Sequence, residues 1–275
     1  MSMNFGWVRD PELHLTKGGI FHLARAAYAL DEPMRVDTIE LAELTPIKDQ
    51  GTELGSCVGC SFTSAAEHLL GGKVTLSALA AYVMALELDG NPGQDIGTRL
   101  STMGRVFQLA GVPEERFYPY DVSTFPHASG YDPKRAGMPV LARERAYDHK
   151  GIPSYVIQTW GRPAGDVITD VVSALQMNRK VALGHMVAKD FWTYDGSDPS
   201  KVFDAPVTNL GGHCSLLAGV RGMIKSENPM DWEFKIQEPW GVLWGVRGYA
   251  WVTARFLTDI GNELTVITDM PGEYA

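Results

Sequence analysis

Apolar residues change from helical spacing in the first half of the chain to strand-like spacing in the second half. Three segments of helical spacing, each followed by a glycine or proline turn, predict helices over residues 57–70, 77–88 and 98–109. Thr75 or Ser77 is a suitable N-cap for the second of these helices. Five short runs rich in β-branched and aromatic residues predict strands over residues 154–157, 180–184, 215–220, 232–236 and 249–252. One further helix, over residues 164–177, is expected between the first two strands.

The order of these elements indicates an α+β fold, in which a helical half is followed by a mainly antiparallel sheet half. Residues 119–153, rich in proline, glycine and charge, are interpreted as the connection between the halves. A cleft between two such halves is where a functional site is expected.

Charge and composition narrow the classes of function. The 275 residues include 24 Lys and Arg against 33 Asp and Glu, a formal net charge of −9, which disfavours nucleic acid and anionic membranes as partners. No secretory signal or membrane-spanning stretch is recognised, so we expect a cytoplasmic protein, with leaderless export or incorporation into a virion or other assembly left open. The three cysteines, Cys57, Cys60 and Cys214, are too few for a disulfide framework.

Cys57 is the cysteine best placed for chemistry, because a glycine-rich turn leads directly into a predicted helix that begins with this thiol. The positive end of a helix favours the thiolate, although a lone cysteine is more often a small core residue. His213 precedes a buried strand and is a candidate general base, or else a hydrogen-bonded loop histidine. Glu238 precedes a loop with two Trp-Gly pairs and can accept a hydrogen bond from a histidine ring. The amide of Gln50 can donate to an oxyanion near Cys57.

These pieces occur in an order that resembles the papain-like cysteine peptidases, the family of papain and the cathepsins, with the closest likeness in its bacterial or viral branch. The likeness extends over residues 36–252. It is carried by the motifs Gln50-Gly51, Gly55-Ser56-Cys57, Leu76-Ser77, Ile96-Gly97-Thr98, Gly212-His213, Trp240-Gly241, Trp244-Gly245 and Gly248-Tyr249.

The resemblance implies a thiolate–imidazolium pair of Cys57 and His213, which hydrolyses peptide bonds through an acyl-enzyme. It also implies an oxyanion hole formed by Gln50 and the backbone N–H of Cys57, and no cofactor or metal. Glu238 stands where the family has the asparagine that orients the histidine. Substrate binding is assigned to Gly97, Thr98, Gly212 and Trp240. Two departures accompany Glu238: Val58 replaces an aromatic residue, and one extra residue separates Gln50 from Cys57.

The implied fold is a helical left domain facing an antiparallel β-barrel right domain, with the active site in the cleft between them. The expected organisation is an N-terminal extension (1–35), a first strand crossing to the barrel (36–51), the helical domain (52–118), a connection (119–150), the barrel domain (151–260) and a C-terminal tail (261–275). Within the extension, residues 18–30 have helical spacing and either occupy the cleft as a pro-like segment or lie outside the barrel.

Two functions from other classes stay open. The first is a catalytically weakened papain-like protein that serves as a binding or structural module in a larger assembly. The second is a thiol–disulfide oxidoreductase that uses Cys57 and Cys60. A zinc site is disfavoured because the adjacent His213 and Cys214 point to opposite faces of a strand. Cys60 and Cys214 are interpreted as small buried core residues, and the other histidines, among them His185, as surface or packing residues. The expected partner is a peptide or protein substrate.

Overall fold

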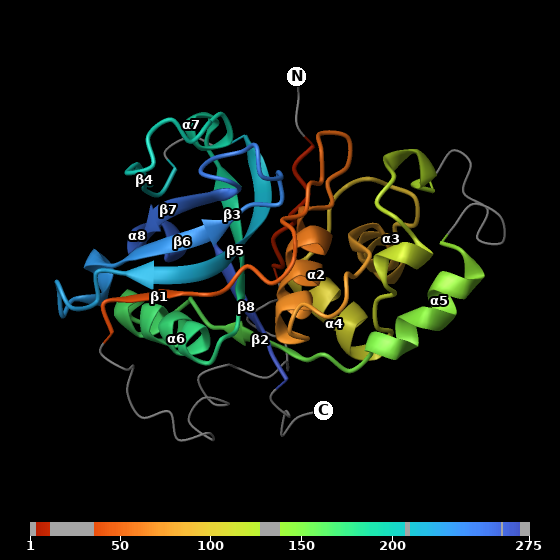
Figure 1. Ribbon diagram of the computed structural model, residues 1–275, viewed down its shortest axis with the longest axis horizontal. Helices are drawn as coiled ribbons and strands as arrows, with labels where there is room; N and C mark the ends of the chain where they lie inside the picture. The colour runs from red at the N-terminus through yellow and green to blue at the C-terminus, as the bar shows by residue number, and fades with distance from the viewer. Residues whose placement is uncertain (1–3, 12–35, 127–137, 207–209, 260, 270–275) are drawn as a thin grey trace.

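The computed structural model describes residues 4–11, 36–126, 138–206, 210–259 and 261–269. Figure 1 shows a helical half on one side and a curved sheet on the other, with helix α2 at the boundary. The predicted helical segment 18–30 lies outside the described residues. The α+β arrangement expected from the sequence is confirmed.

The helical half contains the three helices predicted from apolar spacing. They are α2 (Cys57–Leu69), α3 (Ala78–Leu88) and α4 (Leu100–Leu109), and α5 (Val140–Ala146) lies in the connection. Ser77 is the N-cap of α3, since its hydroxyl accepts a hydrogen bond from the Ala80 N–H at 3.0 Å. Short 3-10 turns cover Glu115–Phe117, Val122–Thr124, Tyr147–His149 and Pro229–Asp231.

The sheet half has eight strands, linked in the order β2-β8-β3-β5-β6-β7-β4, with β1 pairing to β5. The strands are β1 (Thr38–Glu40), β2 (Ser154–Ile157), β3 (Val181–Val187), β4 (Val202–Phe203), β5 (Gly211–Arg221), β6 (Glu233–Gln237), β7 (Tyr249–Thr253) and β8 (Glu263–Ile267). The helices of this half are α6 (Ala164–Gln176), α7 (Lys189–Trp192) and α8 (Ala254–Leu257).

The predicted closed antiparallel barrel is corrected in two respects. Among the described residues the sheet is open, because β2 and β4 lie at opposite ends of the strand order and do not pair. The β4–β7 pair is parallel, whereas the other pairs are antiparallel. Curvature of the sheet still encloses a core, which residues of α6 fill.

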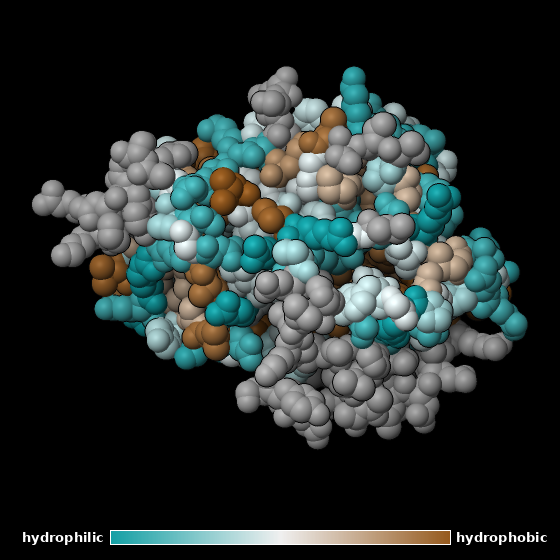
Figure 2. All heavy atoms as spheres, turned by 180° about the vertical axis from the view of Figure 1, so that it is seen from behind, coloured by the Kyte–Doolittle hydropathy of each residue, from teal (hydrophilic) through white to brown (hydrophobic). Residues whose placement is uncertain are grey.

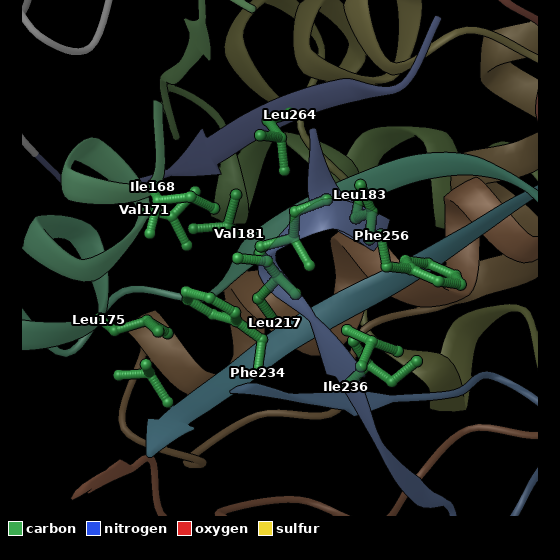
Figure 3. Packing of buried hydrophobic residues seen from close by; sticks show 14 of the residues in the cluster. Ile168, Val171, Leu175, Val181, Leu183, Leu217, Phe234, Ile236, Phe256 and Leu264 are labelled. Carbon is green, nitrogen blue, oxygen red and sulfur yellow. The ribbon is translucent and has the colours of Figure 1, made fainter. Parts of the chain in front are cut away.

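That core is shown in Figure 3. Ile168, Val171 and Leu175 of α6 point toward Val181 and the neighbouring strands. Each of these side chains is almost completely buried, which is worth about 1.5–3 kcal/mol per side chain relative to exposure. The α6 face thereby fixes the sheet that carries the candidate site.

Strand β5 is buried on both faces and joins the two halves. Cys214 and Leu216 lie in the core shared with α2, whereas Leu217 and Val220 lie in the core shared with α6. The sequence placed the start of this strand at residue 215, yet it begins at Gly211. Two glycines and a histidine have little strand propensity by themselves, and pairing with β3 makes them strand.

Residues 261–275 were expected to form a tail, and this assignment is wrong for β8. Residues 263–267 lie between β2 and β3 and are buried along their length.

Among the residues that the structure describes, no helix is long and apolar enough to cross a membrane. Figure 2 shows one face of the surface, on which apolar residues stand singly or in small groups among hydrophilic ones.

Candidate active site

Cys57 is the first residue of α2 and lies completely buried at the boundary of the two halves. Burial raises the pKa of its thiol to about 12, although backbone hydrogen bonds from Gly6, Cys214 and Val58 act in the opposite direction. The helix terminus was expected to favour the thiolate. Removal of the thiol from water acts in the opposite direction and disfavours the thiolate.

His213 lies at the beginning of β5, and the hydrogen bond between Cys57 and the backbone of Cys214 brings the thiol next to this strand. Its Nε2 is 2.7 Å from Oε2 of Glu238, and its ring stacks on the indole of Trp240 with centroids 4.2 Å apart. Nδ1 has no hydrogen-bond partner among the described residues. Burial lowers the pKa of His213 to about 3, which disfavours the imidazolium.

Glu238 follows β6, and its N–H donates to the Gly248 carbonyl at 2.9 Å, which fixes the backbone ahead of the Trp-Gly loop. The carboxyl group is fully buried. One oxygen faces His213 and the other is hydrogen-bonded to the hydroxyl of Ser215. Burial raises the pKa of Glu238 to about 8.

The backbone of Gln50 is hydrogen-bonded to residues of both halves of the fold. Its N–H donates to the Pro239 carbonyl at 2.8 Å, and its carbonyl accepts from the Tyr120 hydroxyl at 3.0 Å. The side-chain Nε2 lies 3.4 Å from the Leu54 carbonyl and 3.5 Å from the Asn4 carbonyl. The amide is therefore directed at the backbone carbonyls of Leu54 and Asn4.

The N-terminal segment, defined here as residues 4–10, lies between β5 and α2 (Figure 1). Trp7 N–H donates to the Gly212 carbonyl at 3.1 Å, and Trp7 forms a parallel bridge with Thr98. Thr98 N–H donates to the Gly6 carbonyl at 2.8 Å, and Val8 N–H donates to the Thr98 carbonyl at 3.0 Å. The segment thus binds through its main chain, as an added strand does.

Side chains anchor this segment at both ends. The Trp7 indole packs against Gly184, where an added Cβ would come within 2.4 Å of the ring, and donates to Glu263 at 3.2 Å. Asp10 N–H donates to the same carboxyl group at 2.6 Å. Phe5 meets the ring of His213 edge-on, with centroids 6.4 Å apart. Together these contacts cover the Cys57 and His213 region.

The structure brings Cys57, His213, Glu238 and Gln50 to one region. Gly97, Thr98 and Gly212 line the path of the N-terminal segment there, and a Cβ on Gly97 would lie 2.2 Å from the Gly6 carbonyl oxygen. The indole of Trp240, assigned to substrate binding, covers the His213 ring. The roles of all eight residues stay predictions.

Cys60 and Cys214 are buried and free, as expected for core residues. Across the described ranges, no group of three or more His, Cys, Asp or Glu side chains is arranged to hold a metal ion.

Sequence reasoning missed several residues of this region. Phe5 and Gly6 precede the stretch that resembles the family, so nothing local indicated where they bind. His185 was interpreted as a packing or surface residue, and it is buried beside Ser215 and His213. The spacing of two residues between His213 and Ser215 was an available signal, since such residues share a strand face.

No model of a known protein family matches the chain. A peptidase C1-like protein of Acanthamoeba polyphaga mimivirus, itself uncharacterised, is 26% identical over 220 residues, which cover 77% of this chain. The matched region spans 65% of the length of that viral protein.

Solved structures of cysteine proteases share the fold. Xylellain, a cysteine protease from Xylella fastidiosa, matches with a TM-score of 0.68 at 19% identity, over 97% of this chain and 96% of that one. Procathepsin L 3 of the Tenebrio molitor larval midgut matches with a TM-score of 0.61 at 16% identity, over 87% and 72% of the two chains. The resemblance to the papain-like cysteine peptidases is thus confirmed, and the chain has their fold.

Proposed function

We propose that this protein is a cysteine peptidase. In the proposed reaction His213 takes the proton of Cys57, and the sulfur attacks a peptide carbonyl whose oxygen is bound by Gln50 and the backbone N–H of Cys57. His213 then protonates the leaving amine, and water releases the acyl group. Glu238 orients the His213 ring through Nε2.

The observation that carries this proposal is the binding of residues 4–10 between the two halves. Gly212 and Thr98 hydrogen-bond to the main chain of an extended peptide, and the backbone of Gly6 within it is close enough to Cys57 to act on the pKa of the thiol. Main-chain recognition of this kind accepts many sequences, which suits a peptide substrate.

We further propose that the N-terminal segment holds the enzyme inactive. It occupies the path that we assign to substrate, and its Trp7 lies in the same core cluster as the buried Cys57, whose pKa is raised by burial. A neutral thiol is a poor nucleophile, so activity requires the segment to leave. This proposal gives the pro-like role to residues 4–10.

Alkylation is tested on the full chain, and hydrolysis on the full chain that carries Gly6→Ala. A Cβ on Gly6 would lie 1.6 Å from the Gly55 carbonyl oxygen, so this substitution displaces the N-terminal segment. Iodoacetamide, with the adduct located by mass spectrometry, should label Cys57, and His213→Ala should slow that labelling. Hydrolysis of unfolded casein should be lost in Cys57→Ala and retained in Cys60→Ala, the matched control one helical turn away. The proposal would be contradicted if Cys57 were labelled at the same rate with and without His213→Ala and no casein were hydrolysed.

A catalytically weakened binding module is the second candidate, favoured by the buried thiol of Cys57. The two candidates separate when the N-terminal segment is displaced, because only a peptidase then gains hydrolysis. The oxidoreductase alternative requires Cys60, whose sulfur lies 4.0 Å from the Ser56 hydroxyl. A reversible disulfide between Cys57 and Cys60, with no hydrolysis of casein, would favour that alternative.

A further inference from the structure

A second buried histidine lies beside the candidate base. His185 of β3 is the register partner of His213 of β5, and their rings meet at 87° with centroids 5.7 Å apart. Both nitrogens of His185 are hydrogen-bonded. Nδ1 lies 3.0 Å from the Met186 carbonyl, and Nε2 lies 2.7 Å from the Ser215 hydroxyl.

These bonds form a continuous chain to the candidate base. The Ser215 hydroxyl is also hydrogen-bonded to Oε1 of Glu238, and Oε2 of the same carboxyl group is 2.7 Å from Nε2 of His213. All four side chains are fully buried, so water does not stand in for any of these partners. We call His185, Ser215 and Glu238 the relay.

Counting protons leaves two arrangements of the relay. A carbonyl only accepts, so Nδ1 of His185 carries a proton, and Ser215 has one proton to donate. In the first arrangement Glu238 is a carboxylic acid that donates to Ser215, which donates to a neutral His185. In the second, Glu238 is a carboxylate that accepts from Ser215, which accepts from a His185 imidazolium.

We propose that His185 and Ser215 are positioning residues that share one proton with Glu238, so that the group facing His213 changes its charge when His213 does. This inference rests on the proposed peptidase reaction. As His213 takes the Cys57 proton, the Oε1 proton of Glu238 moves to Ser215 and the Ser215 proton moves to Nε2 of His185. Glu238 loses one proton and His185 gains it, so the net charge of the relay stays constant.

The surroundings favour the uncharged arrangement while the site is covered. Burial lowers the pKa of His185 to about 4 and raises that of Glu238 to about 8. Among the described residues, the ionisable groups that act on Glu238 from neighbouring elements are His185 of β3, His213 and Cys214 of β5, and Cys57 of α2. The α7 and α8 side chains that meet the His185 ring are both phenylalanine and bring no charge.

The relay also accounts for a glutamate where the resembled family has asparagine. A bare carboxylate beside His213 would hold the imidazolium too strongly for it to donate its proton later in the reaction. A carboxylic acid presents a neutral acceptor oxygen, as an amide does. Glu238 can therefore take the place of the family's asparagine because Ser215 and His185 accept its proton when His213 becomes charged.

Histidine ring NMR on the full-length, 15N-labelled protein tests the relay without any activity. At neutral pH His185 should be a neutral ring with its proton on Nδ1, and Ser215→Ala should shift its Nε2 resonance. His68→Gln, which changes a buried histidine bound to Asn178, is the control and should leave His185 unchanged. The proposal would be overturned if His185 were neutral with its proton on Nε2, or if Ser215→Ala left the Nε2 resonance of His185 unchanged.

The pH dependence of Cys57 alkylation tests the consequence for the reaction. Ser215→Ala should slow alkylation about tenfold and shift its pH profile, because one hydrogen bond to a charged group is lost. Ser215→Thr retains the hydroxyl and should restore the profile. In Glu238→Gln, where no proton is shared, Ser215→Ala should have a smaller effect. If Ser215→Ala slows alkylation by the same factor in Glu238→Gln as in the wild type, Ser215 has only a structural role and the proposal is overturned.

Discussion

Gly6 is the position where the cover of the active site is most easily tested. A Cβ added to this residue would lie 1.6 Å from the Gly55 carbonyl oxygen, where carbon atoms in contact are ordinarily about 3.5–4.0 Å apart. Gly55 lies two residues before the start of α2 and is itself buried, so it has no room to move away. Gly6→Ala therefore displaces the N-terminal segment from the cleft.

The size of the effect follows from the bonds next to Gly6. Displacement breaks the hydrogen bond from Thr98 to the Gly6 carbonyl and the one from Trp7 to Gly212. At about 1 kcal/mol each, their loss amounts to about 2 kcal/mol, or roughly a thirtyfold increase in the uncovered population. Alkylation of Cys57 should accelerate by a similar factor.

The assay compares iodoacetamide labelling of the wild type and Gly6→Ala at several pH values. Gly165→Ala is the matched control, because a Cβ there comes no closer than 3.9 Å to its nearest neighbour, Pro229. Circular dichroism verifies that both variants are folded. A folded Gly6→Ala protein that is labelled at the wild-type rate would refute the idea that residues 4–10 cover the thiol.

Three further changes have defined outcomes. The pKa of Glu238 is raised from 4.5 to about 8, so its contribution to the free energy of unfolding falls as pH rises through that range. Denaturant unfolding at several pH values between these limits should show that Glu238→Gln removes the decline. An unchanged slope of the unfolding free energy against pH would contradict this prediction. Trp240→Ala removes the indole that stacks on His213 and should lower kcat for casein more than it raises KM, whereas an effect confined to KM would indicate substrate binding. Glu67 is fully buried and paired with Lys48 at 2.8 Å, so Glu67→Ala should lower the free energy of unfolding by about 3–5 kcal/mol, and a loss below about 1 kcal/mol would show that the pair is dispensable.

The helical half was predictable because its signals are local. Apolar spacing and the Ser77 cap identify α3 without knowledge of any partner. Cys57 could be placed at a helix start for the same reason, since the glycine-rich turn before it stops any earlier element. His213 could be assigned to the site because Gly212-His213 directly precedes a predicted apolar strand.

What could not be predicted depends on pairing between distant residues. His185 becomes a neighbour of His213 only through the β3–β5 register, which no short stretch of sequence specifies. Strand β8 was taken for a tail because its polar Glu263 and Thr265 interrupt the apolar pattern, although both are buried in the sheet. The direction of the Cys57 pKa shift was missed because the covering residues lie far away in sequence.

The contact between Asp10 and Glu263 joins residues 253 positions apart, and it orders events during synthesis of the protein. Residues 4–10 leave the ribosome before Cys57 and His213, whereas Glu263 lies in a strand that emerges after both. A nascent chain that has folded its helical half therefore has no complete anchor for Trp7 until β8 enters the sheet. Full anchoring of the segment is consequently among the last steps of folding, because Trp7 and Asp10 gain their shared carboxylate partner only when β8 is in place.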